Sequence, residues 1–236
     1  MGDLMASIVT ASEARLRLLD RGVLKYGVLR TLWEHIPSTL HMGLLELLHT
    51  YKLAYPLYSK EGASLGGSLV PAMLPAALLD DGGGVIPPTQ DSVLGVVADG
   101  ESECVVRVVL DFTPPDLWPK VVVGVSGMSE PGRLSQTAAE VTLGGNRALV
   151  TLEDKQVTVT SRGPSAGSLR GIAYGCIVSM LEEHFPRLFE SMKVQLVCPH
   201  AHITHVRTKL KRHIGAGTAI ECEECEESDG HVYILP

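Results

Sequence analysis

The residues best suited to chemistry stand near the end of this chain. Cys198-Pro199-His200-Ala201-His202 is followed, after a spacer, by Cys222-Glu223-Glu224-Cys225. Thiolates and imidazoles are the ligands that Zn²⁺ prefers, and two short ligand clusters separated by a spacer can close one tetrahedral site. We therefore predict a structural zinc ion held by Cys198, Cys222, Cys225 and either His200 or His202.

The fourth ligand is the open point of this prediction. Ala201 occupies the position at which a second cysteine would complete a Cys-x-x-Cys pair with Cys198. A histidine must then supply the ligand, unless the three cysteines are free thiols at the end of an intracellular domain. A catalytic zinc would also need an open coordination position beside a carboxylate that acts as base. The glutamates around Cys222 are close in sequence, although such a charged run is more often a solvated loop.

Other catalytic motifs are missing from the sequence. No phosphate-binding loop of the G-x-x-x-x-G-K-[ST] type occurs, so we expect no nucleotide in this chain. Gly163-Pro164-Ser165-Ala166-Gly167 has the letters of a nucleophile elbow but lacks the parallel strand that should precede it. Ser165 is better explained as the N-terminal cap of a helix. We predict a chain without an active site, with a small zinc-dependent hydrolase or a stand-alone zinc-containing adaptor as the alternative.

Composition narrows the class of protein further. The 236 residues are 45% hydrophobic and 20% charged, with a formal net charge of −7. This negative balance disfavours nucleic acid as a partner, because binding to the phosphate backbone relies on clustered basic side chains. No apolar run is long enough to predict a transmembrane segment or a signal peptide. Cys104 and Cys176 stand alone in apolar surroundings, which indicates a reducing, cytoplasmic location.

The first part of the chain, residues 1–75, has the pattern of short amphipathic helices. Ser12 can cap a first helix, and a second extends from Leu29 to Ile36, where Pro37 stops it. A third helix after Ser38 has an apolar stripe of Leu40, Leu44, Leu47, Leu48 and Tyr51. His35, His41, His49 and His184 lie on predicted helices without paired carboxylates, and we expect them at the surface or its boundary. Two extended runs, 53–58 and 67–70, then predict a hairpin that completes a winged-helix-like subdomain.

The second part of the chain has a different pattern. Residues 76–90, within a segment rich in proline and glycine, are predicted to be an irregular linker. In residues 91–197, strict alternation from Glu103 to Phe112 predicts a half-buried strand, and three further runs separated by turn residues predict an antiparallel meander. A segment from Leu117 to Val125 suits a helix, although its valines also suit a strand. Apolar residues from Leu169 to Leu181 predict a long helix that Pro186 ends or kinks.

These elements predict an α+β fold: the winged-helix-like subdomain, an antiparallel sheet packed against a long helix, and a small zinc-knuckle-like tail at 198–236.

Five segments, in order, resemble the COR domain of Roco proteins, the group that includes the leucine-rich-repeat kinases. The matching segments are Gly22–Trp33, taken as a helix, Leu44–Tyr55, Leu69–Pro75, Phe112–Trp118 and Val157–Pro164. The resemblance extends from about Arg21 to Pro199, and it implies the end of COR-A followed by COR-B. The GTPase module and the beginning of COR-A, which precede these segments in the family, are not seen in this sequence.

The resemblance implies a function and a set of partners. In the family, COR is a non-catalytic regulatory and dimerisation module that couples the GTPase (Roc) module to the rest of the protein. The parent protein is then expected to be a GTPase, and it could also carry a kinase. We expect a homodimer formed through COR-B, and an interface with the Roc module around Tyr55 and Tyr58. Trp33 and Tyr51 lie nearby, but the helical spacing of Trp33 favours the core.

Overall fold

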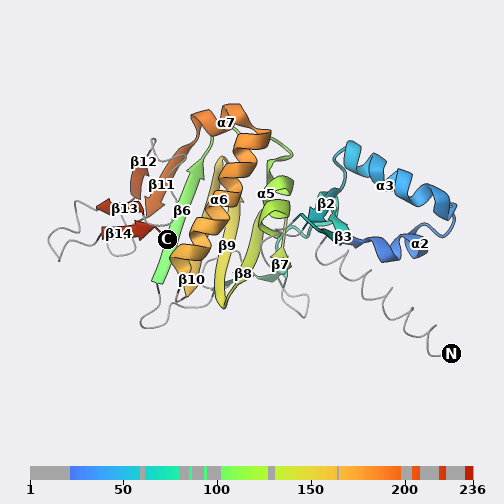
Figure 1. Cartoon of the computed structure of the whole chain (residues 1–236), viewed down its shortest axis with the longest axis horizontal. Helices are drawn as coiled ribbons and strands as arrows, with labels where there is room; N and C mark the ends of the chain where they lie inside the picture. The colour runs from blue at the N-terminus through green and yellow to red at the C-terminus, as the bar shows by residue number, and fades with distance from the viewer. Residues whose placement is uncertain are drawn as a thin grey trace.

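The fold is α+β, as the sequence predicts, and consists of a small N-terminal part with short helices followed by a large antiparallel sheet covered by helices (Figure 1). We analysed a computed structural model. It describes residues 22–58, 62–79, 85–86, 93–94, 102–126, 131–163, 165–197, 204–207, 218–221 and 232–235. The first predicted helix, capped by Ser12, lies outside the described residues.

The first subdomain combines a three-stranded antiparallel sheet with short helices. The sheet order is β1-β3-β2, so the predicted hairpin of β2 and β3 is confirmed. The elements in chain order are β1 Val23–Lys25, a 3₁₀ turn Tyr26–Val28, α2 Leu29–Leu32, a 3₁₀ turn Ser38–Leu40, α3 His41–Thr50, β2 Tyr55–Tyr58 and β3 Ser64–Leu69.

Two expectations for this subdomain are wrong. The segment that begins at Gly22, expected to be helical, starts with strand β1, because Gly22 adopts a left-handed φ of 63° and its carbonyl accepts a bond from the Val70 N–H at 2.7 Å. Helix α2 is also a single turn that ends at Leu32 instead of extending to Ile36. Pairing with β3 therefore overrides a local helical pattern in this segment.

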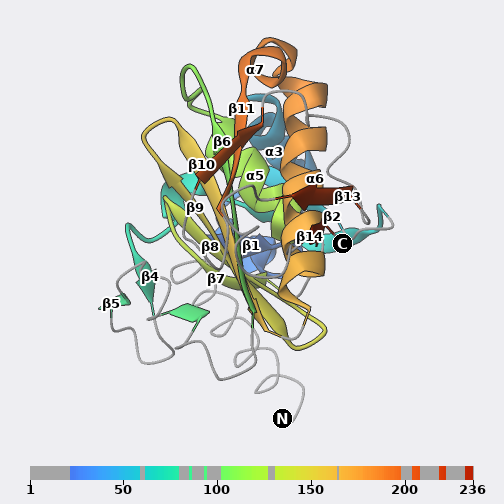
Figure 2. The ribbon, with the colours of Figure 1, turned by 90° about the vertical axis from the view of Figure 1, so that its left-hand side faces the viewer.

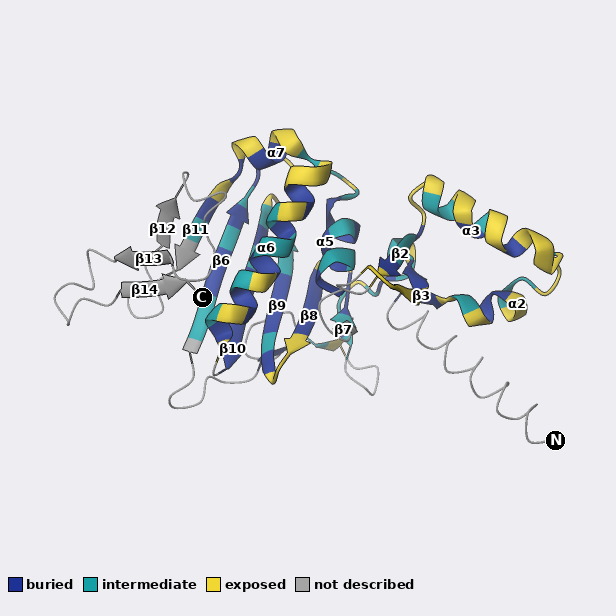
Figure 3. Ribbon diagram, viewed as in Figure 1, coloured by how far each residue is buried: buried dark blue, intermediate teal, exposed yellow. Residues whose placement is uncertain are grey.

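The apolar stripe expected to be buried on the third helix mostly faces solvent. The buried residues of α3 are His41 and Leu45, whereas Leu40, Leu47 and Tyr51 are exposed. The helix packs on the small cluster formed by β1 and α2, which is too small to cover a second face (Figure 3).

The segment between the two parts contains more structure than its composition predicts. Residues Pro71–Met73 form a 3₁₀ turn, and β4 (Leu78–Leu79) pairs with β5 (Val85–Ile86) in an antiparallel hairpin. Leu78 is fully buried against Val93 and against Leu149 of the main sheet, so tertiary contacts stabilise a hairpin where the proline and glycine content predicted irregular chain.

The main sheet has seven antiparallel strands in the order β12-β11-β6-β10-β9-β8-β7. The predicted meander is confirmed, with Gly144 and Gly145 at positive φ in its first turn and Asp154 at positive φ in its second. The strands in chain order are β6 Ser102–Val109, β7 Pro131–Leu134, β8 Ala138–Leu143, β9 Asn146–Glu153, β10 Gln156–Gly163, β11 Lys193–Val197 and β12 Thr204–Arg207. Strand β6 ends at Val109, and Phe112, expected on its buried face, is exposed.

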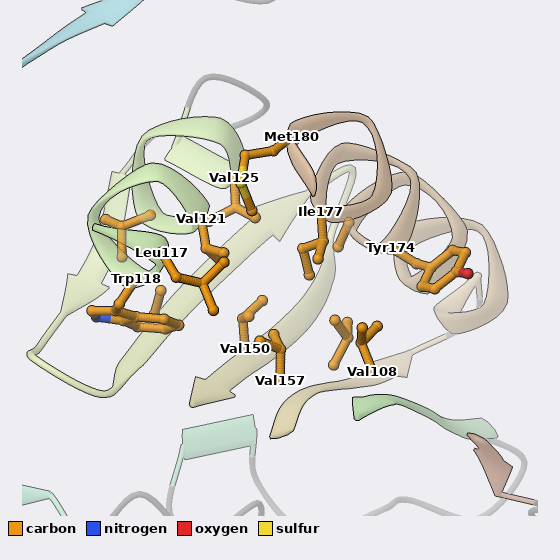
Figure 4. Packing of buried hydrophobic residues seen from close by; sticks show 14 of the residues in the cluster. Val108, Leu117, Trp118, Val121, Val125, Val150, Val157, Tyr174, Ile177 and Met180 are labelled. Carbon is orange, nitrogen blue, oxygen red and sulfur yellow. The ribbon is translucent and has the colours of Figure 1, made fainter. Parts of the chain in front are cut away.

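Helices cover one face of this sheet. The ambiguous segment is helix α5 (Leu117–Ser126), and the predicted long helix is α6 (Ala166–His184), which ends before α7 (Pro186–Ser191). Both α5 and α6 lie on the same side of the sheet, while β4 and β5 lie on the other (Figure 2). Valines of β6, β9 and β10 pack against the apolar faces of α5 and α6 and form the main core (Figure 4).

The first subdomain shares this core. Val23, Leu57, Leu69 and Leu74 belong to the same buried cluster as the main sheet and α5. At the surface of this junction, the Lys52 ammonium donates to the Asp116 carboxylate at 2.7 Å. Apolar contact, reinforced by this exposed ion pair, therefore joins the two parts.

The described strands after β12 form a separate pair. Strand β13 (Thr218–Glu221) pairs with β14 (Val232–Leu235), and β14 lies against α6. Residues 232–235, an apolar run, thus form a strand that pairs with β13. None of the helices in the described residues is both long and apolar enough to cross a membrane.

Candidate functional site

The predicted zinc ligands lie in segments that the structure does not describe. These are Cys198, His200, His202, Cys222 and Cys225. Among the residues that it does describe, no group of three or more His, Cys, Asp or Glu side chains is placed to hold a metal ion. The zinc site therefore stays a prediction from the sequence.

The two tyrosines predicted to face a GTPase module differ in their surroundings. Tyr55 begins β2 and is half-buried against the main core, and burial raises the pKa of its hydroxyl. Tyr58 ends β2 and is exposed. Of the two, Tyr58 offers the larger contact surface, whereas Tyr55 also supports the packing of β2 against α5.

A larger apolar surface lies on the same subdomain. Leu47 on α3 is 51% exposed, and Tyr51, the residue directly after the helix and one turn further along, is 71% exposed. The large hydrophobic side chains exposed on this subdomain are Leu40, Met42, Leu47, Tyr51, Leu53, Tyr58 and Leu65. We call Leu40, Leu47 and Tyr51 the α3 stripe. Aromatic and methionine side chains are enriched at interfaces between proteins, so this concentration is typical of a contact surface.

Histidine side chains hold α3 in this position. His41, expected at the surface or its boundary, is buried, and its Nε2 donates to the Ile36 carbonyl at 2.9 Å, with the Trp33 carbonyl at 3.2 Å. Both neighbours are acceptors, so Nε2 carries the proton. The half-buried ring of Trp33 meets the His41 ring edge-on, with centroids 5.5 Å apart. His41 therefore joins the end of α2 to the beginning of α3.

A second histidine joins α3 to the sheet. His49 Nε2 lies 2.8 Å from the hydroxyl of Ser68 on β3, and that hydroxyl also meets the Tyr26 hydroxyl at 3.1 Å. Burial lowers the pKa of His49, and the nearby Glu46 only partly opposes this effect. Because neutral imidazole bonds to a hydroxyl without bringing a buried charge, the contact suits a structural role.

Polar groups are also buried on the face of α6 that points away from α5. Arg170 is only 7% exposed, and among the described residues the structure shows no hydrogen bond or ion pair for its guanidinium. The hydroxyl of Tyr174, one turn further along, is likewise buried without a partner in this part of the chain. Figure 4 shows this hydroxyl turned away from the valine core. Periodicity did not single out these residues, because it identifies the buried face but not the polar groups on it.

The opposite face of the sheet carries a compact ion-pair cluster. The Glu140 carboxylate on β8, only 7% exposed, accepts from Arg133 at 2.7 Å and also from Arg147 on β9. Burial raises the pKa of Glu140, but the two arginines outweigh this effect and hold it below its ordinary value. Arg147 also donates to the Val93 carbonyl, so the cluster fastens the 93–94 segment to the sheet.

Comparisons with known proteins do not identify a family: no family model matches the chain, and no curated protein is similar to it.

Proposed function

We propose that this chain is a non-catalytic regulatory and dimerisation module, the COR module of a Roco GTPase, which couples a GTPase (Roc) module to the rest of a larger protein. The ordered sequence segments between Gly22 and Pro164 suggest the family. The observation that carries the proposal is the concentration of exposed apolar side chains around α3 and the β2–β3 hairpin. A surface of this kind is stabilised when a partner protein covers it.

The first subdomain is proposed to be winged-helix-like. Short helices α2 and α3 precede a β2–β3 hairpin, and β1 completes a three-stranded sheet beside that hairpin. In this interpretation β2 and β3 are the wing, and Tyr58 lies at the end of its first strand. The α3 stripe and Tyr58 would then form the interface with the GTPase module.

The second part is proposed to be COR-B and to form the homodimer. Its valine-rich sheet face is covered by α5 and α6, so that face is not the contact surface. Ile172, on α6, is an exposed apolar residue of this part and provides a position at which the dimer can be tested. A two-fold interface, in which both subunits use the same self-complementary patch, is the commonest form of homodimer.

The tail is proposed to hold one structural zinc ion through Cys198, Cys222, Cys225 and a fourth ligand. The chain after β11 has little apolar sequence with which to build a core, and a metal cross-link stabilises such segments. Metal analysis of protein purified without added zinc tests this point. We expect about one zinc ion per chain, which is lost in Cys222→Ala.

The proposed function is tested by binding of the chain to the GTPase module of the parent protein, measured calorimetrically. Replacing both Leu47 and Tyr51 by serine should weaken binding at least tenfold, since each removes apolar area from a contact that excludes water. Exposed Thr50, next to Tyr51, supplies the matched control as Thr50→Ser. Unchanged binding of the double variant, or tight GTP binding by the chain alone, would contradict the proposal.

A further inference from the structure

The starting point is the spacing of the apolar side chains on the outer side of α3. Four of them follow one another at intervals of four, three and four residues, and they are Leu40, Leu44, Leu47 and Tyr51. This is the spacing with which one helix presents a continuous apolar seam to another. The three members of the α3 stripe are each more than half exposed, and the fourth residue of the seam is partly exposed (Figure 3). The seam therefore lies outside the core.

Gly43 lies beside this seam. It follows Leu40 by three residues and precedes Leu47 by four, so it shares their side of the helix. Glycine is less favourable within a helix than every other residue except proline. A Cβ at Gly43 would have nothing within 4 Å, so the packing of the chain itself does not require a glycine here. A missing side chain does allow the backbone of a second helix to approach closely.

The charges of α3 favour a partner of the same kind. Glu46 is its one acidic side chain, it lies off the seam, and the helix has no lysine or arginine. The residues that flank the seam on one side, Gly43 and Thr50, are uncharged. Charged flanking residues are what select an oppositely charged partner helix. An uncharged seam does not repel its own copy, so it suits a two-fold contact in which Leu40 of one copy lies beside Tyr51 of the other.

The exposed area sets the strength of such a contact. From their exposed fractions, the three side chains of the α3 stripe present roughly 250–350 Å² of apolar surface to solvent. A stable interface buries about 800 Å² on each partner. The contact therefore belongs to the small, transient class, and a partner that covers more of this subdomain can displace it.

We propose that two copies of this chain pack their α3 stripes against each other, antiparallel across a two-fold axis, when no GTPase module covers them. Gly43 lies near the axis, where the two helices approach most closely. This inference rests on the proposed role of the α3 stripe and adds a second occupant of the same surface. Because both occupants use the same side chains, they exclude each other. The contact is separate from the homodimer proposed through COR-B.

The test is sedimentation equilibrium of the full chain from about 1 µM to about 1 mM. Ile172→Asp serves as the background, because it disturbs the contact proposed for COR-B. We expect a monomer–dimer equilibrium that is weakened at least tenfold when Leu47 and Tyr51 are both replaced by serine. Met42→Ser is the matched control, since Met42 is 57% exposed on the opposite side of α3, and it should leave the equilibrium unchanged. A chain that stays monomeric throughout, or an equal effect of the control, would overturn the proposal.

Gly43→Gln tests the close approach of the two helices. Glutamine is a better helix former, so the midpoint of thermal unfolding measured at low concentration should rise. Self-association should nevertheless fall at least tenfold, because the new side chain fills the space that the second helix would occupy. A folded variant that associates as strongly as its background would contradict this packing.

The outcomes separate this inference from the proposed function. If the chain stays monomeric but binds the GTPase module through Leu47 and Tyr51, only this inference fails. If it associates through the α3 stripe but does not bind the GTPase module, the proposed function fails and the self-contact stands. Excess GTPase module should also reduce the stripe-dependent association, and an association that persists with the module bound would contradict the mutual exclusion.

Discussion

Glu140 offers a stringent test of the described structure, because its buried carboxylate is held by two arginines from neighbouring strands. Glu140→Gln preserves the size of the side chain but removes its charge. The amide oxygen can still accept from one arginine, while the amide nitrogen turns a donor toward the other. The variant therefore loses an ion pair and leaves a guanidinium without its acceptor.

The expected cost is about 2–3 kcal/mol of unfolding free energy. Removing one partner of a fully buried ion pair costs about 3–5 kcal/mol, and a hydrogen bond to a charged group contributes about 1.5–3 kcal/mol. We expect a cost below that of breaking a fully buried pair, because Arg133 and Arg147 are 27% and 37% exposed and their guanidinium groups can regain water when the carboxylate is lost. For a chain of this length, the midpoint of thermal unfolding should fall by about 5–10 °C.

Urea unfolding at several pH values is the decisive assay. The folded pKa of Glu140 lies below its ordinary value of 4.5, so its contribution is present above that value and is lost as pH falls through the folded pKa. The difference in unfolding free energy between the wild type and Glu140→Gln should therefore decrease as the pH is lowered. Glu153→Gln, at an exposed position on β9, is the matched control and should change stability by less than about 0.5 kcal/mol. Equal stability of wild type and Glu140→Gln at neutral pH would refute the reasoning.

Two further predictions concern the backbone and the shared core. Gly163→Ala should destabilise the protein by about 1–3 kcal/mol in urea unfolding, because Gly163 has a φ of 126° and a Cβ would lie 2.7 Å from Oδ1 of Asn146. Gly175→Ala, in open space within α6, should instead stabilise it slightly, and equal effects of the two variants would contradict this account. Leu69→Ala should cost about 2–5 kcal/mol and lower hydrogen-exchange protection in both parts of the chain, since Leu69 is fully buried in their common core. Loss of protection confined to residues 22–79 would show that the two parts unfold separately.

The sequence was most informative where local pattern and tertiary environment agree. The meander could be predicted because its strands are short runs that include β-branched residues, such as Val157 to Thr160 on β10, and each turn contains residues that tolerate positive φ, such as Gly144 and Asp154. Helix α6 could be predicted for a similar reason: its buried residues, including Leu169, Ala173 and Ile177, recur at helical spacing on one face. In both cases a large apolar surface covers the predicted face: the helices α5 and α6 cover the sheet, and the sheet covers α6.

Hydrophobic periodicity gave wrong predictions where the element that packs against a segment is small, or lies far away in the sequence. Helix α3 has more apolar residues than the small cluster of Leu24, Val28 and Leu29 can cover. Periodicity therefore identified an apolar stripe on this helix but did not show that most of the stripe faces solvent. Strand β1 exists because it pairs with β3 across more than forty residues, a contact that no local window contains. Arg170 escaped notice because an arginine within an apolar helix is normally expected to point to solvent.

The shared core limits how the proposed coupling can work. A partner bound at the α3 stripe would act on a subdomain whose residues Leu57 and Leu69 are packed into the same cluster as α5 and the main sheet. In a close-packed core of this kind, a displacement of one element moves the elements packed against it, because the core has almost no free volume to absorb the shift. The exposed Lys52–Asp116 pair contributes little by itself, since surface ion pairs are worth about 0–1 kcal/mol. Coupling between the two parts would therefore pass through the apolar contact of β2 with α5, where Tyr55 lies, and not through the ion pair beside it.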